Sequence, residues 1–192
     1  GGNATLGPDQ IICMDGYSLT EAHYTVLQNS TFMAPYMEEH KNILSSKYPE
    51  QSEDWITPEQ TRTFAGWLQP RAMRDDAIED DMYLLSQLPS SNIMTFKGYE
   101  INGNTFYTIA QDKKSTNQNS DVLFDAATSR GNDTYYGYIE EIWELDHGSD
   151  LKVPLFQCKW VNLTGGSVKE DPQYEMTTAD LNNLAYADEP FA

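Results

Sequence analysis

The sequence is poor in cysteine and basic residues, and it has no long apolar run. Its 192 residues include two cysteines, Cys13 and Cys158, which are far apart and suggest no disulfide framework. This usage is typical of a reducing, intracellular compartment. No stretch of about 18 apolar residues occurs, so we expect no membrane span.

Basic side chains are heavily outnumbered. The chain has 12 Lys and Arg against 30 Asp and Glu, for a formal net charge of −18. Residues 1–96 carry 5 basic and 14 acidic side chains and residues 97–192 carry 7 and 16, so neither half forms a basic tail. Because phosphate contacts dominate nucleic-acid affinity, we do not expect this chain to bind nucleic acid directly. The acidity favours basic partners, and it is equally typical of a solvated surface without a specific partner.

Motifs that carry chemistry are also missing from the sequence. It has no glycine-rich phosphate loop and no nucleophile elbow, so no catalytic or cofactor-binding residue and no cofactor is predicted. Cys13, His23 and His40 do not have the spacing of a zinc site and lack a fourth ligand.

One acidic run is a candidate for a divalent cation, since hard cations prefer several oxygen ligands. A metal site there would need carboxylates from other elements, such as Glu140 or Glu144, in the same cleft. An unbroken acidic run is otherwise typical of a solvated helix face, and we predict no metal ligand. The run comprises Asp75, Asp76, Glu79, Asp80 and Asp81.

The first half of the chain is predicted to be helical. Residues 1–16 show little periodicity and suggest a linker or disordered end, and the absence of an initial methionine suggests a piece of a longer protein. A helical segment is predicted over 17–90. Capping residues, prolines in first turns and apolar spacing place helices near 19–29, 35–48 and 57–68, with a short fourth helix after the acidic run.

The second half, 96–192, is predicted to be rich in strands. Asn102-Gly103 between alternating residues is a strong hairpin signal for residues 99–107. Residues 122–126 suggest a short strand, and 135–161 suggest two long strands joined by the loop 146–150. These long strands are apolar on both faces, so we expect both faces to be covered, by a closed barrel or by other elements. The fold class is α+β: a helical N-terminal segment and a small antiparallel β-barrel or bent-sheet domain, in which an SH3-like or bromo-adjacent-homology-like barrel is one option.

The long strands also carry the candidate binding site. Some small barrels hold methylated lysines in an aromatic cage, where the cation meets ring faces and acidic groups attract a basic tail. Aromatic residues on central strands are more often core residues, and both interpretations stay open. The candidate residues are Tyr136, Tyr138, Trp143, Phe156, Trp160 and Glu144.

Several motifs together resemble a known family. Order and spacing match over about 95 residues, and residues 21–67 match more loosely, although Asp121 stands where the family usually has glycine. The motifs are Gly98-Tyr99-Glu100-Ile101-Asn102-Gly103, Phe106-Tyr107-Thr108, Gln118-Asn119-Ser120, Tyr135-Tyr136-Gly137, Glu141-Ile142-Trp143-Glu144-Leu145-Asp146, Phe156-Gln157-Cys158-Lys159-Trp160-Val161 and Asp188-Glu189-Pro190-Phe191. This region is similar to the C-terminal domain of unknown function in plant CACTA-type (En/Spm-like) transposon proteins.

The resemblance implies a nuclear protein of transposon origin whose Asp-Asp-Glu catalytic core lies upstream in another domain, so no catalytic residue is carried over. We therefore expect a non-catalytic accessory module that binds a protein partner, either the transposase core or a host nuclear protein. One alternative is a chromatin or basic-peptide reader that uses the aromatic strands. The other is a fragment of a metal-dependent DNA-processing enzyme.

Overall fold

The computed structural model has an α+β fold, as the sequence predicts. It describes residues 3–4, 8–112, 121–128, 131–162 and 169–178, and the side chains within 8–111 and 137–159. The chain divides into two compact units. The helical unit comprises Cys13–Ile93 and Leu145–Val153, and the sheet unit comprises Gly1–Ile12, Met94–Glu144 and Pro154–Ala192. The predicted loop at 113–120 and the tail beyond residue 178 lie outside the described residues.

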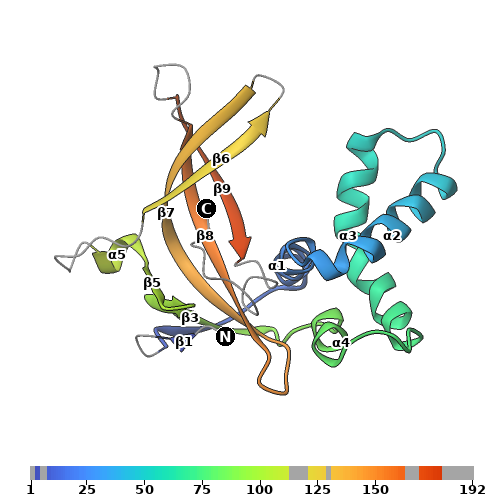
Figure 1. Cartoon of the computed structure of the whole chain (residues 1–192), viewed down its shortest axis with the longest axis horizontal. Coiled ribbons are helices and arrows are strands. Elements are labelled where there is room, and N and C mark those ends of the chain that lie inside the picture. Colours follow the sequence, from blue (N-terminus) through green and yellow to red (C-terminus); the bar gives the residue numbers. More distant parts are fainter. Residues whose placement is uncertain (1–2, 5–7, 113–120, 129–130, 163–168, 179–192) are drawn as a thin grey trace. The chain divides into compact units, whose positions relative to one another are not determined.

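Helix α1 (Gly16–Gln28) opens the helical unit (Figure 1). The capping-box spacing Ser18-Leu19-Thr20-Glu21 is the reason why the sequence predicts that this helix starts near residue 19, and that start is wrong. Asp15 is the N-cap, and its carboxylate accepts the backbone N–H of Ser18 at 2.8 Å. A carboxylate also suits the positive end of the helix dipole, so Asp15 starts the helix three residues earlier than the spacing suggested.

The remaining helices follow in chain order. A 3-10 turn, Thr31–Met33, leads into α2 (Ala34–Lys47), which has Pro35 in its first turn as predicted. Helix α3 runs over Glu53–Met73, and α4 over Asp80–Ser86.

Helix α3 is longer at both ends than the sequence predicts. The sequence predicts Pro58 in its first turn and Pro70 just after its end, yet both lie in the interior of the helix. Ile56 and Ala72, beyond those limits, are 3% and 1% exposed. Their burial offsets the hydrogen bonds that the prolines cannot donate.

The strands form two sheets. Antiparallel β4 (Gly98–Ile101) and β5 (Asn104–Tyr107) join β1 (Asn3–Ala4) in a three-stranded sheet of order β1-β4-β5. The larger sheet has the order β2-β3-β7-β8-β9, with β6 paired to β7. Its strands are β2 (Gln10–Cys13), β3 (Asn92–Phe96), β6 (Asp121–Thr128), β7 (Gly131–Asp146), β8 (Lys152–Asn162) and β9 (Lys169–Thr178). A short helix, α5 (Ile109–Asp112), follows β5.

Two expectations about this half need correction. The segment 1–16 was predicted to be a linker or disordered, yet it supplies β1 and β2, because both find partners far along the sequence in β4 and β3. The described strands form open sheets with no closed barrel among them. Figure 1 shows β7 and β8 as long curved strands.

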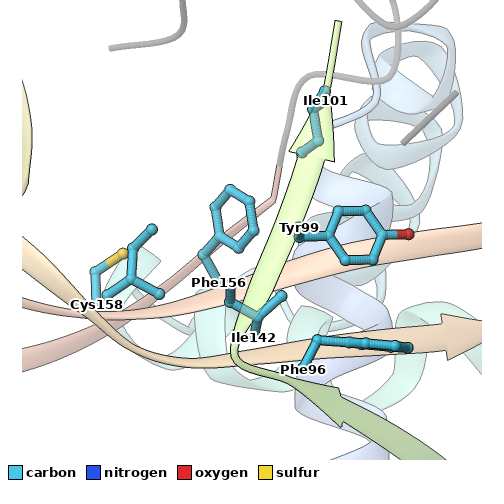
Figure 2. Packing of buried hydrophobic residues seen from close by; sticks show 7 residues of the cluster. Phe96, Tyr99, Ile101, Ile142, Phe156 and Cys158 are labelled. Atoms are coloured by element: carbon cyan, nitrogen blue, oxygen red, sulfur yellow. The ribbon is translucent and has the colours of Figure 1, made fainter. Parts of the chain in front are cut away.

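The core of the sheet unit is built from β3, β4, β7 and β8 (Figure 2). Ile139 and Ile142 of β7 are fully buried although they differ in parity along the strand, and the same holds for Leu155 and Cys158 of β8. In β8 the adjacent residues Leu155 and Phe156, which point to opposite faces, are also both buried, so this part of β8 is covered on both faces, whereas Ile139 and Ile142 of β7 belong to a single core cluster. The core cluster comprises Phe96, Tyr99, Ile101, Ile139, Ile142, Phe156 and Cys158.

In the described part of the chain, no helix combines the length and apolar character needed to cross a membrane.

Candidate functional site

The predicted aromatic site lies on two strands of the sheet unit. Tyr136, Tyr138, Trp143 and Glu144 are on β7, and Phe156 and Trp160 are on β8. The side chains of Tyr136 and Trp160 lie outside the described ones, so the site is assessed from the other four residues.

Phe156 is a core residue and not part of an exposed cage. It is 7% exposed and belongs to the buried cluster of the sheet unit. Its ring contacts that of Phe106, with 5.3 Å between centroids. A ring packed in this way cannot present a face to a ligand, so the prediction is wrong for Phe156.

Trp143 and Tyr138 differ from Phe156, since both are partly exposed. The indole N–H of Trp143 donates to the Glu141 carboxylate at 2.9 Å. Across the sheet, Trp143 pairs with Thr95 of β3. Trp143 therefore has a partly accessible ring with a carboxylate beside it, and its role in binding stays a prediction.

Glu144 has a structural partner. Its Oε2 accepts the hydroxyl of Tyr99 at 2.7 Å, and Tyr99 is 1% exposed. Burial and the adjacent Glu144 carboxylate raise the pKa of Tyr99, because both disfavour the phenolate. This carboxylate satisfies a buried hydroxyl, which limits its use for a ligand.

The acidic run does not form a metal site. Asp75 accepts hydrogen bonds from the Tyr36 hydroxyl and the Ala77 backbone N–H. The hydrogen bond from Tyr36 is the main reason why the pKa of Asp75 is lowered. The rest of the run is exposed: Asp76, Glu79, Asp80 and Asp81. Among the described residues, no three His, Cys, Asp or Glu side chains gather where they could hold a metal ion.

All three histidines of the chain are buried in the helical unit. His23, His40 and His147 are 0%, 3% and 7% exposed. His40 packs between the rings of Phe64 and Trp67, and its Nε2 lies 3.2 Å from the Thr63 hydroxyl. Cys13 is exposed. Among the residues that the structure describes, Cys13, His23 and His40 do not gather into a cluster that could hold a metal ion.

Sequence reasoning missed one cluster, the pair His23 and His147. His147 lies in a loop of turn formers, Asp146-His147-Gly148-Ser149-Asp150, where a solvated side chain is the natural expectation. Instead its ring contacts that of His23 on α1, with 5.3 Å between centroids and 50° between planes. No local pattern signals this contact, because the two residues are more than one hundred positions apart.

Both rings bind backbone carbonyls around the end of α4. The Nε2–H of His23 donates to the Leu85 carbonyl at 2.9 Å. The Nδ1–H of His147 is shared between the carbonyls of Leu84, at 3.2 Å, and Gln87, at 3.1 Å. The two imidazoles therefore add donors at the C-terminal end of α4, where few helical N–H groups remain, and the Leu84 carbonyl also accepts the backbone N–H of Gln87 at 3.1 Å.

Burial controls the ionisation of both imidazoles. It lowers the pKa of His23 to about 4, and the adjacent His147 adds to this shift. It also lowers the pKa of His147, against the opposing effects of its two carbonyl hydrogen bonds and of Asp146. Both rings are therefore neutral at pH 7.

Comparison of this chain with protein-family models, with curated proteins and with solved structures finds no match.

Proposed function

We propose that this chain is a non-catalytic interaction module that binds a basic protein partner. The main observation behind this proposal is that all three histidines are buried and hydrogen-bonded within the protein. His23, His40 and His147 are buried and donate to protein groups, so none is placed to exchange protons with a substrate in solution. The described residues also lack a cluster of metal-binding side chains, which the DNA-processing alternative requires.

The preference for a basic partner follows from charge. Lys41, Arg62, Arg71 and Lys97 each form an ion pair with a carboxylate of the chain itself. With these cations engaged, the formal net charge of −18 leaves a large excess of carboxylates to act on a partner. Such a field attracts cationic surfaces and repels phosphates.

The biological setting is proposed from the sequence motifs alone. Their resemblance to the C-terminal region of CACTA-type transposon proteins suggests a nuclear module that binds its transposase core or a host nuclear protein. Assembly of a transposition complex is the role that we propose in this setting.

Trp143 favours a second candidate function, recognition of basic peptides. Its ring is partly exposed, and its N–H binds Glu141, which places a carboxylate beside the aromatic surface. A cation over an indole face gains electrostatic energy from the ring. We propose that this site lies on a strongly bent sheet related to SH3-like or bromo-adjacent-homology-like barrels.

Binding of histone-tail peptides, with and without trimethyllysine, distinguishes the two candidates. The measurement is fluorescence anisotropy of labelled peptides with the wild-type chain, Trp143→Phe and Trp67→Phe. Trp67 is a matched control, because it is also partly exposed but lies in the helical unit.

The reader function predicts that Trp143→Phe weakens binding of the trimethyllysine peptide about fivefold or more, since the substitution replaces the best cation-binding ring. Trp67→Phe should have no effect. Equal binding by all three proteins would remove the reader candidate and leave a general basic partner. Failure of every peptide to bind would contradict the interaction module itself.

A further inference from the structure

The hairpin tip, Leu145–Val153, is held in a conformation that its own backbone does not favour. Gly148, Ser149 and Asp150 have φ values of 80°, 47° and 65°. The left-handed region suits glycine and costs a side-chain-bearing residue about 1 kcal/mol or more. Such strain persists only where surrounding contacts determine the conformation. Hydrogen bonds within the tip, from the His147 N–H to the Leu151 carbonyl at 2.9 Å and from the Leu151 N–H to the Gly148 carbonyl at 2.8 Å, close this turn, and its contacts with the helices fix where it lies.

Those contacts centre on the His23–His147 pair. The imidazole of His147 donates to the carbonyls of Leu84 and Gln87. Its ring also contacts the ring of His23, which lies on α1 and donates to the Leu85 carbonyl of α4. A backbone hydrogen bond from Ser90 to the Asp146 carbonyl, at 2.9 Å, completes the attachment. All of these residues belong to the helical unit.

Each ring has one nitrogen for which the described residues provide no acceptor. Nδ1 of His23 and Nε2 of His147 are buried and have no hydrogen-bond partner in the described protein. A neutral imidazole tolerates this arrangement, because one of its nitrogens carries no proton. An imidazolium must donate from both nitrogens, so protonation of either ring would bury a charged donor without an acceptor.

Neighbouring charged groups provide little electrostatic stabilisation for a protonated imidazole. Only Asp146 among the charged groups of α1, α4 and the tip shifts the pKa of either imidazole, and it raises that of His147. Its carboxylate also accepts the Gly148 backbone N–H at 2.8 Å. A positive charge on His147 lowers the pKa of His23 further, because the two charges repel each other. The other charged groups on these elements are Glu21, Asp80, Asp81, Asp150 and Lys152.

We propose that the His23–His147 pair is a proton-sensitive latch, which holds the tip on α1 and α4 when both rings are neutral and releases it when either ring is protonated. The inference is independent of the proposed partner. It gives the chain a conformational response to acidification below pH 6.5, where a freely exposed histidine gains its proton.

The size of the response follows from His23. With a pKa of about 4 in the closed state and about 6.5 when exposed, the proton favours the released tip about thirtyfold at pH 5. His147 acts in the same direction. Amide hydrogen exchange of the full-length chain at pH 7.5 and pH 5, corrected for intrinsic exchange rates, measures this change.

Hydrogen exchange at three backbone amides distinguishes release of the tip from unfolding within the tip and from unfolding of the helices. The Ser90 amide, bonded to Asp146, should lose at least about thirtyfold in protection at pH 5. The Leu151 amide, bonded to Gly148 within the tip, and the Tyr48 amide, bonded to Leu44 at the end of α2, should change far less. Constant protection of Ser90, or equal losses at Ser90 and Tyr48, would overturn the latch.

A second test uses substitutions that keep an N–H donor at each histidine position but cannot gain a proton between pH 7.5 and pH 5. The amide group of Gln replaces Nε2–H in His23→Gln, and that of Asn replaces Nδ1–H in His147→Asn. The double variant should keep Ser90 protected at pH 5, whereas His40→Gln, at the third buried histidine, should release the tip like the wild type. A double variant that releases the tip as readily as the wild type would refute the proposal.

A direct measurement covers the case in which the double variant does not fold. The ¹⁵N shifts of the imidazoles in the wild-type chain report the proton on each nitrogen. At pH 7.5 they should show His23 protonated at Nε2 and His147 at Nδ1, and one ring should gain a proton as Ser90 loses protection. Two neutral rings during the loss of Ser90 protection would overturn the proposal.

Discussion

At the scale of single residues, His40 illustrates a buried histidine used for packing. Its ring contacts Phe64 and Trp67, with centroid distances of 5.4 and 5.1 Å. The Thr63 hydroxyl donates to the Glu59 carbonyl at 2.7 Å, so the Nε2–H of His40 must be the donor toward Thr63. Nδ1 is buried without a hydrogen-bond partner in the described protein. The geometry therefore favours a neutral ring.

His40 should make the folding free energy of the helical unit dependent on pH. Burial lowers its pKa in the folded state, so the unfolded chain binds the proton first as pH falls below 6.5, and stability decreases. We expect His40→Gln to destabilise the chain less, relative to wild type, at pH 5 than at pH 7.5. Urea denaturation at both pH values measures this difference, and equal destabilisation at both would show that His40 does not contribute.

Tyr99 and Glu144 form the second residue pair whose role can be measured. Tyr99→Phe removes the donor of the 2.7 Å hydrogen bond and leaves the partly exposed carboxylate to water. We expect a loss of about 1–2 kcal/mol in the free energy of unfolding.

Glu144→Gln is the control for this pair, because the amide keeps an acceptor oxygen for the Tyr99 hydroxyl. Its cost should be smaller than that of Tyr99→Phe when both are measured by urea denaturation. A larger cost for Glu144→Gln would mean that the carboxylate has a role other than accepting this hydrogen bond.

At the scale of elements, two glycines should respond to alanine in opposite directions. Asn102 and Gly103 join β4 to β5 with φ values of 51° and 80°, as a type I′ turn requires. Gly103→Ala should therefore cost about 1–2 kcal/mol, because alanine is strained in the left-handed region. Gly66 lies inside α3 with open space around an added Cβ. Gly66→Ala should stabilise the chain by about 0.5–1 kcal/mol.

Urea midpoints of the two variants, followed by circular dichroism, measure these shifts. A stabilising Gly103→Ala would mean that the β4–β5 turn has another conformation in solution. A destabilising Gly66→Ala would mean that something fills the space beside α3.

Elements defined by local signals are the ones that the sequence predicts well. The Asn102-Gly103 hairpin, Pro35 in the first turn of α2 and the acidic start of α4 depend on residues adjacent in the chain, and the structure confirms all three. The N-cap of α1 was misassigned because Ser18 and Asp15 are both good caps, and only geometry chooses between them.

Contacts between distant residues explain the other differences. The prolines of α3 are accommodated because Ile56 and Ala72 are buried in tertiary contacts. Phe156 was a candidate for a cage, yet Phe106 and the core cluster cover it. His147 lies in the predicted loop 146–150, whose turn formers give no sign that α1 and α4 bury its ring. The hydrophobic periodicity of one segment predicts which face is buried, but not which other segment packs against that face.

At the scale of the whole molecule, charge is the property that most constrains the partner. The chain has 30 acidic and 12 basic side chains, and the described ion pairs engage several of the cations internally. Its long-range field is therefore negative, and added salt should screen it. We therefore propose a basic protein surface as the partner in preference to the nucleic-acid backbone.

The most direct test of the account is a comparison of two ligands at two salt concentrations. A lysine- and arginine-rich peptide and a labelled DNA duplex are titrated with the full-length chain at low salt and again at about physiological salt, where the Debye length is about 8 Å. The account predicts that the peptide binds, that its affinity falls with added salt, and that the duplex does not bind. Binding of the duplex in preference to the peptide would contradict an acidic interaction module with a basic protein partner.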